Sequence, residues 1–194
     1  MSALERRAVT AQLLKARGDA LVVTGLGSTT YDSFAAGDSP LTFYLWGAMG
    51  GAAMVGLGLA LAQPKRRVAV LTGDGEMLMG LGSLATIGVR RPSNLAVVVI
   101  DNGLYAETGM QQTHTAHGAD LAAVALACGF ASAETVRTQA ELDAFGRALY
   151  RAPGPVFAAI KVSPAPTKIE LPPRDGPYLR SRFREALLGP EANR

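Results

Sequence analysis

The sequence predicts an α/β fold in which helices cover both faces of a parallel sheet. Short β-branched runs alternate with stretches of helical pattern along most of the chain. The run at 95–100 is apolar at every position, as expected of a strand covered by helices on both sides. With 194 residues, 48% of them hydrophobic, the chain is large enough to form one domain with its own core.

The elements of this fold follow from the pattern in chain order. Residues 4–17 interleave charged and apolar side chains at helical spacing, which predicts an amphipathic helix. Further helices are expected at 50–62, 77–88, 119–128 and 138–150. The helix at 138–150 begins with Thr138 and Glu141 at the spacing of a capping box. Strands are expected at 20–25, 41–45, 67–72, 94–101 and 155–162.

The chain divides into a domain at 1–163 and a tail at 164–194. The tail is rich in proline and arginine and carries no strand pattern. We expect it to be extended, to end in a short helix near 178–188, and to pack on a partner subunit.

Composition argues against several classes of protein. The net charge is only +3, the cationic residues are scattered and aromatic residues make up 6%, so nucleic-acid binding is not expected. The most apolar run, 47–62, falls short of the ~20 residues that cross a bilayer. The N-terminal residues are not those of a signal peptide. Cys128 is the one cysteine, which rules out an internal disulfide and fits the cytoplasm.

A G-D-G motif ends the strand expected at 67–72. Ligands of parallel α/β sheets bind beyond the carboxyl ends of the strands. We expect Gly73 to allow an unusual backbone turn, and Gly75 to let a ligand approach the amides of the next helix, which attract phosphate. The Asp74 carboxylate would repel a phosphate unless a divalent cation lay between them, and this indicates magnesium.

The next strand supplies a second ligand for such an ion. It ends at Asp101 and Asn102, 28 positions after Asp74 (102 minus 74). A right-handed crossover would place this strand end beside the first. The oxygens of Asp74 and Asn102, a loop carbonyl, two diphosphate oxygens and a water would complete an octahedral site.

These motifs resemble the thiamine-diphosphate enzymes, whose fingerprint is G-D-G, an intervening helix and strand, and then N-N or D-N. The resemblance covers roughly residues 18–162. It implies the diphosphate-binding (PP) domain of that fold, with thiamine diphosphate and Mg²⁺ as cofactors. Position by position, it implies that Asp74 and Asn102 bind the metal through their side chains and Leu104 through its carbonyl.

The same resemblance implies further cofactor contacts. Met49 lies 25 positions before Asp74 (74 minus 25), where the family has a bulky apolar residue that holds the cofactor bent. The Gly47 carbonyl would accept a hydrogen bond from the 4′-amino group, and Gly27 and Ser28 would contact the diphosphate.

The predicted cofactor-binding set also includes the residues that follow the strand at 67–72, namely Gly73, Asp74, Gly75 and Glu76. The family usually has a small residue at the position of Glu76. We therefore expect the Glu76 side chain to turn away from the diphosphate.

An essential group of the family is missing from this chain. The resemblance implies that a glutamate activates the cofactor and comes from a separate pyrimidine-binding domain, for which 194 residues leave no room. We therefore expect a pyrimidine-binding (α) subunit as partner, in an α2β2 or larger hetero-oligomer.

Within the family, the motifs are most similar to sulfopyruvate and phosphonopyruvate decarboxylases. This similarity implies nonoxidative decarboxylation of a small anionic 2-oxoacid to an aldehyde and CO2. Met49, Glu107 and His114 are the candidate catalytic residues. The loop at 107–118 is the candidate substrate contact, through Thr108, Gln111, Gln112, His114 and His117.

Other hypotheses about the function of the chain stay open on the sequence alone. One is a carboligating subunit of the acetolactate-synthase type, or a decarboxylase of another small 2-oxoacid. Another is a cofactor-binding subunit with a regulatory role. A ferredoxin-linked oxidoreductase is disfavoured because cluster cysteines are missing, and a nicotinamide-binding domain because "GLGSTT" lacks the third glycine of G-x-G-x-x-G.

Overall fold

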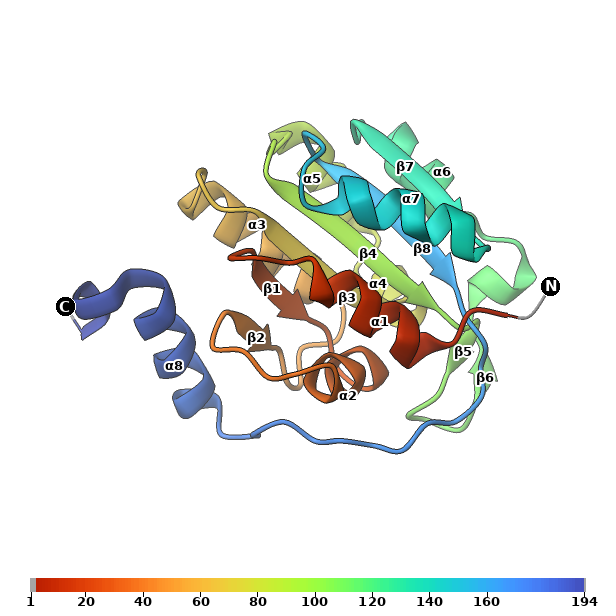
Figure 1. Cartoon of the computed structure of the whole chain (residues 1–194). Coiled ribbons are helices and arrows are strands. Elements are labelled where there is room, and N and C mark those ends of the chain that lie inside the picture. Colours follow the sequence, from red (N-terminus) through yellow and green to blue (C-terminus); the bar gives the residue numbers. More distant parts are fainter. Residues whose placement is uncertain (1–2, 194) are drawn as a thin grey trace.

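Six parallel strands form a single sheet in the order β2-β1-β3-β4-β8-β7 (Figure 1). The computed structural model describes residues 3–193. The strands of the sheet are β1 (Leu21–Thr24), β2 (Thr42–Tyr44), β3 (Val68–Gly73), β4 (Leu95–Asp101), β7 (Ser132–Val136) and β8 (Val156–Lys161). Two further strands, β5 (Leu104–Tyr105) and β6 (Gln111–Gln112), pair antiparallel in a separate hairpin.

Helices cover both faces of the sheet, which confirms the predicted doubly wound fold (Figure 1). The helices are α1 (Arg6–Lys15), α2 (Ser28–Ala35), α3 (Ala52–Ala62), α4 (Asp74–Met79), α5 (Gly82–Arg90), α6 (Leu121–Ala127), α7 (Gln139–Leu149) and α8 (Gly176–Leu188). Two short 3-10 helices are η1 (His114–His117) and η2 (Gly189–Asn193). Among the residues described, no helix combines the length and the apolar character needed to cross a membrane.

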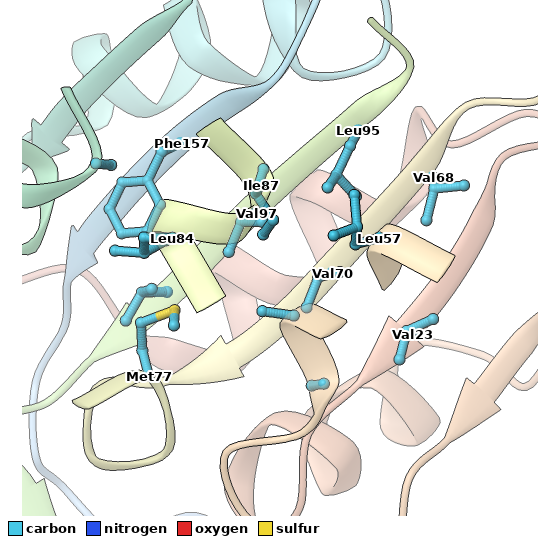
Figure 2. Close-up of a cluster of buried hydrophobic side chains, with 14 of the residues drawn as sticks. Val23, Leu57, Val68, Val70, Met77, Leu84, Ile87, Leu95, Val97 and Phe157 are labelled. Carbon is cyan, nitrogen blue, oxygen red and sulfur yellow. The ribbon is translucent and has the colours of Figure 1, made fainter. Parts of the chain in front are cut away.

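The two faces of the sheet carry separate cores because strand side chains alternate in direction. Val70 of β3 packs into the core that contains Leu57 of α3, whereas its neighbour Leu71 belongs to the core of α1 and α7 (Figure 2). Every residue of β4 is buried, from Leu95 to Asp101. At roughly 1.5–3 kcal/mol for each large apolar side chain, this burial is the main source of stability.

The register of the central strands sets the position of the site. β3 and β4 pair in parallel from Val68 opposite Leu95 to Gly73 opposite Ile100. Asp74 and Asp101 follow this last pair and therefore lie side by side at the carboxyl ends of the two strands, as the sequence predicted.

Besides the short β5–β6 hairpin and the two 3-10 helices, two elements are absent from the sequence-based prediction. β7 is an edge strand in which only Val136 is fully buried, so it lacks the apolar run that marks the inner strands. No helix was expected at α2, whose sequence, STTYDSFA, is largely polar. Several of its buried polar side chains have specific partners, for example Thr30, whose hydroxyl lies 2.7 Å from that of Thr24.

The single helix expected at 77–88 is two helices, α4 and α5, and the expectation was wrong on this point. The break falls at Gly80 and Leu81, where a close approach of two backbone segments requires glycine. A Cβ on Gly80 would lie 2.3 Å from the carbonyl oxygen of Gly50. This contact ties the segment before α3 to the helix that begins at Asp74.

The C-terminal tail packs along the domain itself (Figure 1). The Ser163 amide donates to the Leu4 carbonyl at 2.8 Å, and the Trp46 indole donates to the Pro173 carbonyl at 3.0 Å. The terminal helix α8 was expected near 178–188, and its Phe183 ring packs 5.7 Å from that of Phe43. Contact between the tail and a partner subunit stays a prediction.

The close packing of α5 on α6 gives a first prediction. A Cβ on Gly88 would lie 1.7 Å from the Cys128 carbonyl oxygen, so Gly88→Ala should force the helices apart and cost roughly 1–3 kcal/mol in unfolding free energy. Gly82→Ala on the same helix meets nothing within 4 Å and should be neutral or stabilising by up to about 1 kcal/mol. Urea denaturation of both variants measures the difference, and equal stabilities would contradict this packing.

Candidate functional site

A cleft of about 670 Å³, open to solvent, lies at the carboxyl ends of β1, β3 and β4. It is formed by loops that follow these strands, by the start of α2 and by the segment before α3. The predicted site residues that line it are Gly27, Ser28, Met49, Gly73, Asp74, Gly75, Glu76, Asn102, Leu104, Glu107 and Thr108. The structure therefore brings together segments that are as far apart in the sequence as Gly27 and Thr108.

Asp74 is the most deeply buried acid of this cleft, with only 2% of its surface exposed. It is the first residue of α4, and its Oδ2 accepts hydrogen bonds from the hydroxyls of Thr113 at 2.5 Å and Thr115 at 3.3 Å. Burial raises the pKa of the Asp74 carboxyl; the Thr113 bond opposes this shift and the nearby charge of Asp101 adds to it. A cation beside Asp74 would stabilise its charged form.

A second buried acid, Asp101, is paired with a cation of its own. Its Oδ2 forms an ion pair with Lys161 at the end of β8, and its Oδ1 accepts from Thr115 at 2.8 Å and from the Gly103 amide at 3.1 Å. Thr115 therefore lies between the two carboxylates. Since Asp101 is neutralised by Lys161, Asp74 is the acid at these strand ends that is left for an incoming cation.

Asn102 and Leu104 are fixed by a tight local turn. The Asn102 Oδ1 accepts from the Leu104 amide at 2.9 Å, which is an Asx-turn. This bond uses one of the two lone pairs of the amide oxygen and leaves the other for a ligand. Asp74, Asn102 and Leu104 all line the same cleft, as a shared metal would require.

The first glycine of the motif differs from what was expected, and the second has a role beyond the expected one. Gly73 has extended backbone, with φ −88° and ψ 163°, so the predicted unusual turn is wrong. A Cβ on Gly73 would meet nothing within 4 Å, and since Gly73 lines the cleft, the missing side chain leaves space there. At Gly75 a Cβ would lie 2.4 Å from the Tyr105 ring, so this glycine makes room for an aromatic side chain.

Glu76 points toward the loop after β1. Its Oε2 accepts from the Leu26 amide at 3.3 Å, and a Cβ on Gly25 would lie 1.7 Å from that oxygen. Burial raises the pKa of the Glu76 carboxyl, and the hydrogen bond from the Leu26 amide opposes the shift. The carboxyl of Glu76 thus links two of the loops that form the cleft.

Met49 and Gly47 occupy the segment between β2 and α3. Met49 lines the cleft, and 38% of its surface is exposed. Gly47 has φ +71°, where glycine is favoured, but it is not among the residues that line the cleft.

The predicted catalytic residues Glu107 and His114 are separated in space. Glu107 lines the cleft beside Tyr31, whose hydroxyl lies 3.5 Å from its Oε2. His114 and His117 are exposed on η1, and neither lines the cleft. Across the described residues, no group of three or more His, Cys, Asp or Glu side chains is placed to hold a metal.

Comparison with known proteins identifies the family. The model of "Thiamine pyrophosphate enzyme, C-terminal TPP binding domain" matches residues 24–160, which is more than half of the chain. The chain belongs to the thiamine pyrophosphate enzymes. The matched region contains the predicted cofactor contacts, from Gly27 through Leu104, and the resemblance inferred from the G-D-G and D-N motifs is confirmed.

Relatives of this thiamine pyrophosphate enzyme chain include subunits of its own size. It is 42% identical over 171 residues to sulfopyruvate decarboxylase subunit beta of Methanothermobacter thermautotrophicus, covering 88% of this chain and 89% of that one. The subunit of the same name from Methanocaldococcus jannaschii is 37% identical over 169 residues, covering 86% of this chain and 88% of that one.

Other relatives are much longer. Phosphonopyruvate decarboxylase of Streptomyces viridochromogenes is 43% identical over 147 residues, which is 75% of this chain but 36% of that protein. A solved structure from Mycobacterium smegmatis, described as thiamin diphosphate-dependent, superposes with a TM-score of 0.72 at 25% identity and covers 84% of this chain and 32% of that one. The chain thus spans about a third of these longer proteins.

Sequence reasoning missed several residues of this thiamine pyrophosphate enzyme site. Arg6 lines the cleft from α1, although nothing in its sequence context distinguishes it from Arg7. Thr113 and Thr115 donate hydrogen bonds to Asp74. They flank His114 in the sequence, and only the histidine was predicted as a site residue. Lys161 was part of an expected strand, and its pairing with Asp101 depends on the neighbouring positions of β4 and β8.

Removing one member of the Asp101–Lys161 pair is predicted to have a different effect on stability from removing the other. The Asp101 side chain is 1% exposed and that of Lys161 28% exposed, so Lys161→Met leaves a buried charge unpaired, whereas Asp101→Asn leaves an ammonium that still reaches water. With a discount for the exposure of Lys161, we expect Lys161→Met to cost roughly 2 kcal/mol in unfolding free energy and Asp101→Asn clearly less.

The double variant Asp101→Asn/Lys161→Met should be more stable than Lys161→Met alone, because no unpaired charge remains. Denaturant titration of the four proteins without cofactor measures the coupling. Simple additivity of the two single substitutions would show that the pair does not neutralise Asp101.

Proposed function

We propose that this chain is the diphosphate-binding subunit of a split thiamine-diphosphate-dependent decarboxylase that acts on a small anionic 2-oxoacid. The observation that carries the proposal is the length of its relatives. The chain matches nearly the whole of two subunits named sulfopyruvate decarboxylase beta, but only about a third of a phosphonopyruvate decarboxylase that is one longer chain. The part of the longer decarboxylase that this chain does not match would have to be supplied by a second chain in the present protein.

The charges of the cleft support magnesium as the second cofactor. Its charged lining residues are Asp74, Glu76, Glu107 and a single cation, Arg6. A diphosphate brings further negative charge, and a divalent ion between it and Asp74 would offset both. The donors available for the ion are a carboxylate, an amide oxygen and a carbonyl, from Asp74, Asn102 and Leu104, and these hard oxygen ligands suit Mg²⁺.

Thiamine diphosphate, when bound, supplies the electron sink that accepts the electron pair released as CO2 leaves. The residues of this chain bind and orient the cofactor. Asp74 and Asn102 would hold the diphosphate end through the ion, and the space over Gly73 would leave room for it. Met49 would support the cofactor from the wall of the cleft, and the Gly47 carbonyl would accept from the 4′-amino group.

The partner subunit would complete the site. An α subunit that contributes the activating glutamate has to cover the cleft on the side of Met49, since the 4′-amino end of the cofactor lies there in this proposal. An α2β2 or larger assembly in the cytoplasm is part of the proposal. The tail at 164–194 offers its exposed side chains for contact with that subunit.

Substrate contacts are proposed for the loop that follows β4. Of the residues proposed to contact the substrate, Glu107 and Thr108 line the cleft. Gln111, Gln112, His114 and His117 are exposed, so any contact of theirs with the sulfonate or phosphonate of a substrate would be made from outside the cleft. His114 is retained as a candidate on sequence grounds.

Mixing the two subunits tests this function. The chain alone, with cofactor and magnesium, should release CO2 from sulfopyruvate or phosphonopyruvate at least about a hundredfold more slowly than the mixture with its α subunit, because the group that activates the cofactor is then missing. Release of CO2 and aldehyde is measured. In the mixture, Glu107→Gln should lower the rate more than the matched change His114→Gln. Full activity of the chain alone would contradict the proposal.

A further inference from the structure

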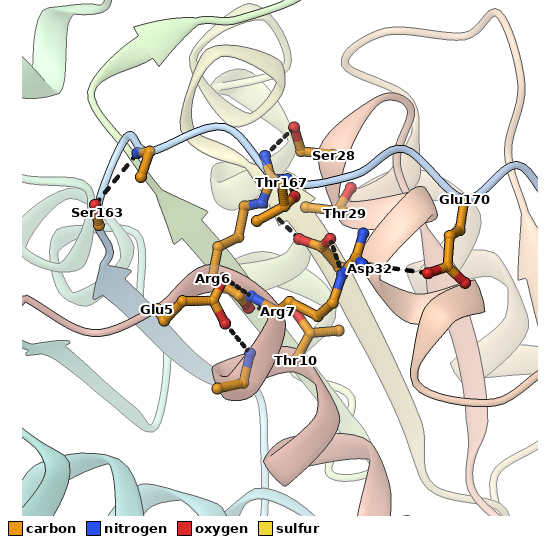
Figure 3. A network of polar contacts seen from close by, with 12 residues as sticks. Glu5, Arg6, Arg7, Thr10, Ser28, Thr29, Asp32, Ser163, Thr167 and Glu170 are labelled. Carbon is orange, nitrogen blue, oxygen red and sulfur yellow. Dashed lines mark hydrogen bonds and ion pairs between the residues drawn. The ribbon is translucent and has the colours of Figure 1, made fainter.

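One cation lies among the described residues that line the cleft, and it comes from the N-terminal helix. Arg6 is the first residue of α1, is 9% exposed and contacts the start of α2 (Figure 3). The other charged residues of the lining are acids, and Asp74 is the one assigned to the metal. A divalent ion offsets only part of the negative charge that a diphosphate and Asp74 bring together, which leaves a role for this cation.

The contacts of Arg6 place its charge at the diphosphate side of the cleft. Its Nη1 donates to the hydroxyl of Ser28, the first residue of α2, and its Nη2 donates to the hydroxyl of Thr167 in the tail. Gly27 precedes α2 and provides no side-chain cap, so amides of the first turn are available to an anion. A guanidinium and the start of a helix thus converge on one corner of the cleft.

Arg6 shares its acidic partner with a second cation. Its Nε pairs with Asp32 at 2.6 Å, and Arg7 shares the same buried carboxylate at 3.1 Å (Figure 3). Arg7 has a second acid, Glu170 at 3.3 Å, whereas the terminal nitrogens of Arg6 meet the neutral hydroxyls of Ser28 and Thr167. An anionic ligand at Ser28 would therefore be attracted to Arg6.

We propose that Arg6 binds the terminal phosphate of the cofactor, together with Ser28 and the first amides of α2. This inference rests on the proposed function, since it assumes that thiamine diphosphate occupies the cleft. Beside the metal that Asp74 and Asn102 would hold, it adds a direct contact from a cation of this chain, with Arg6 and the start of α2 at the terminal phosphate. Since Arg6 also holds Thr167, the tail supports the arginine from behind.

Arg7 provides a matched control, because it lies on the same helix, pairs with the same Asp32 and does not line the cleft. Trp46 is the only tryptophan of the chain and lies 6.3 Å from the ring of Tyr31 on α2, so its fluorescence can report ligand binding. Thiamine diphosphate, thiamine monophosphate and inorganic pyrophosphate are titrated in Mg²⁺ onto the wild-type chain and onto Arg6→Gln and Arg7→Gln.

Arg6→Gln should weaken pyrophosphate and thiamine diphosphate binding by roughly tenfold or more, the loss expected for one charge-assisted hydrogen bond. The ratio of its affinities for thiamine diphosphate and thiamine monophosphate should fall by about the same tenfold factor. Arg7→Gln should change neither affinity by more than about threefold, because Arg7 does not line the cleft. Equal effects of the two substitutions would overturn the assignment of Arg6.

Two outcomes keep this inference separate from the proposed function. If the wild-type chain binds no thiamine diphosphate in Mg²⁺, either alone or together with its α subunit, the proposed function fails, and the inference with it. If the wild type binds and Arg6→Gln matches Arg7→Gln, the inference alone fails. If Arg6→Gln does not fold, Arg6→Lys is compared with Arg7→Lys. Because lysine lacks the guanidinium fork, Arg6→Lys should raise the Kd for pyrophosphate at least about threefold more than Arg7→Lys does. Equal Kd values for the two variants would overturn the proposal.

Discussion

The site depends on an aspartate that is buried at a strand end without a cation of its own. Asp74 is held by the hydroxyls of Thr113 and Thr115, and its neighbour Asp101 already has Lys161. Two carboxylates so close together in a buried setting raise the cost of keeping both charged. The protein neutralises one of them internally, and we propose that the metal and the cofactor neutralise the other.

The rest of the fold can be understood as the support for this arrangement. The register of β3 and β4 brings Asp74 and Asp101 to the same edge of the sheet, and the pairing of β4 with β8 brings Lys161. The close approach of Gly50 and Gly80 ties the segment that carries Met49 to the helix of Asp74. α1 reaches the site from the other face of the sheet and contributes Arg6.

The sequence was sufficient to predict what depends on local pattern. Apolar strands, the G-D-G and D-N motifs and the position of Met49 identified the fold class and most of the cleft. The sequence was insufficient where contacts between distant segments determine the structure. β7 is polar because it lies at an edge of the sheet, and α2 can bury Asp32 because Arg6 of α1 pairs with it. The break at Gly80 reflects its contact with Gly50. Arg6 and Lys161 entered the site through pairings that sequence spacing does not reveal.

Calorimetry of cofactor binding tests the central role of Asp74 most directly. Thiamine diphosphate is titrated onto the full chain, alone and with its partner subunit, in Mg²⁺ and in chelator, and Asp74→Asn is compared with Asp120→Asn, which changes the cap of α6. The account predicts tight binding that requires the metal, and a loss of about tenfold or more in Asp74→Asn alone. Equal affinity with and without metal, or unchanged affinity in Asp74→Asn, would contradict it.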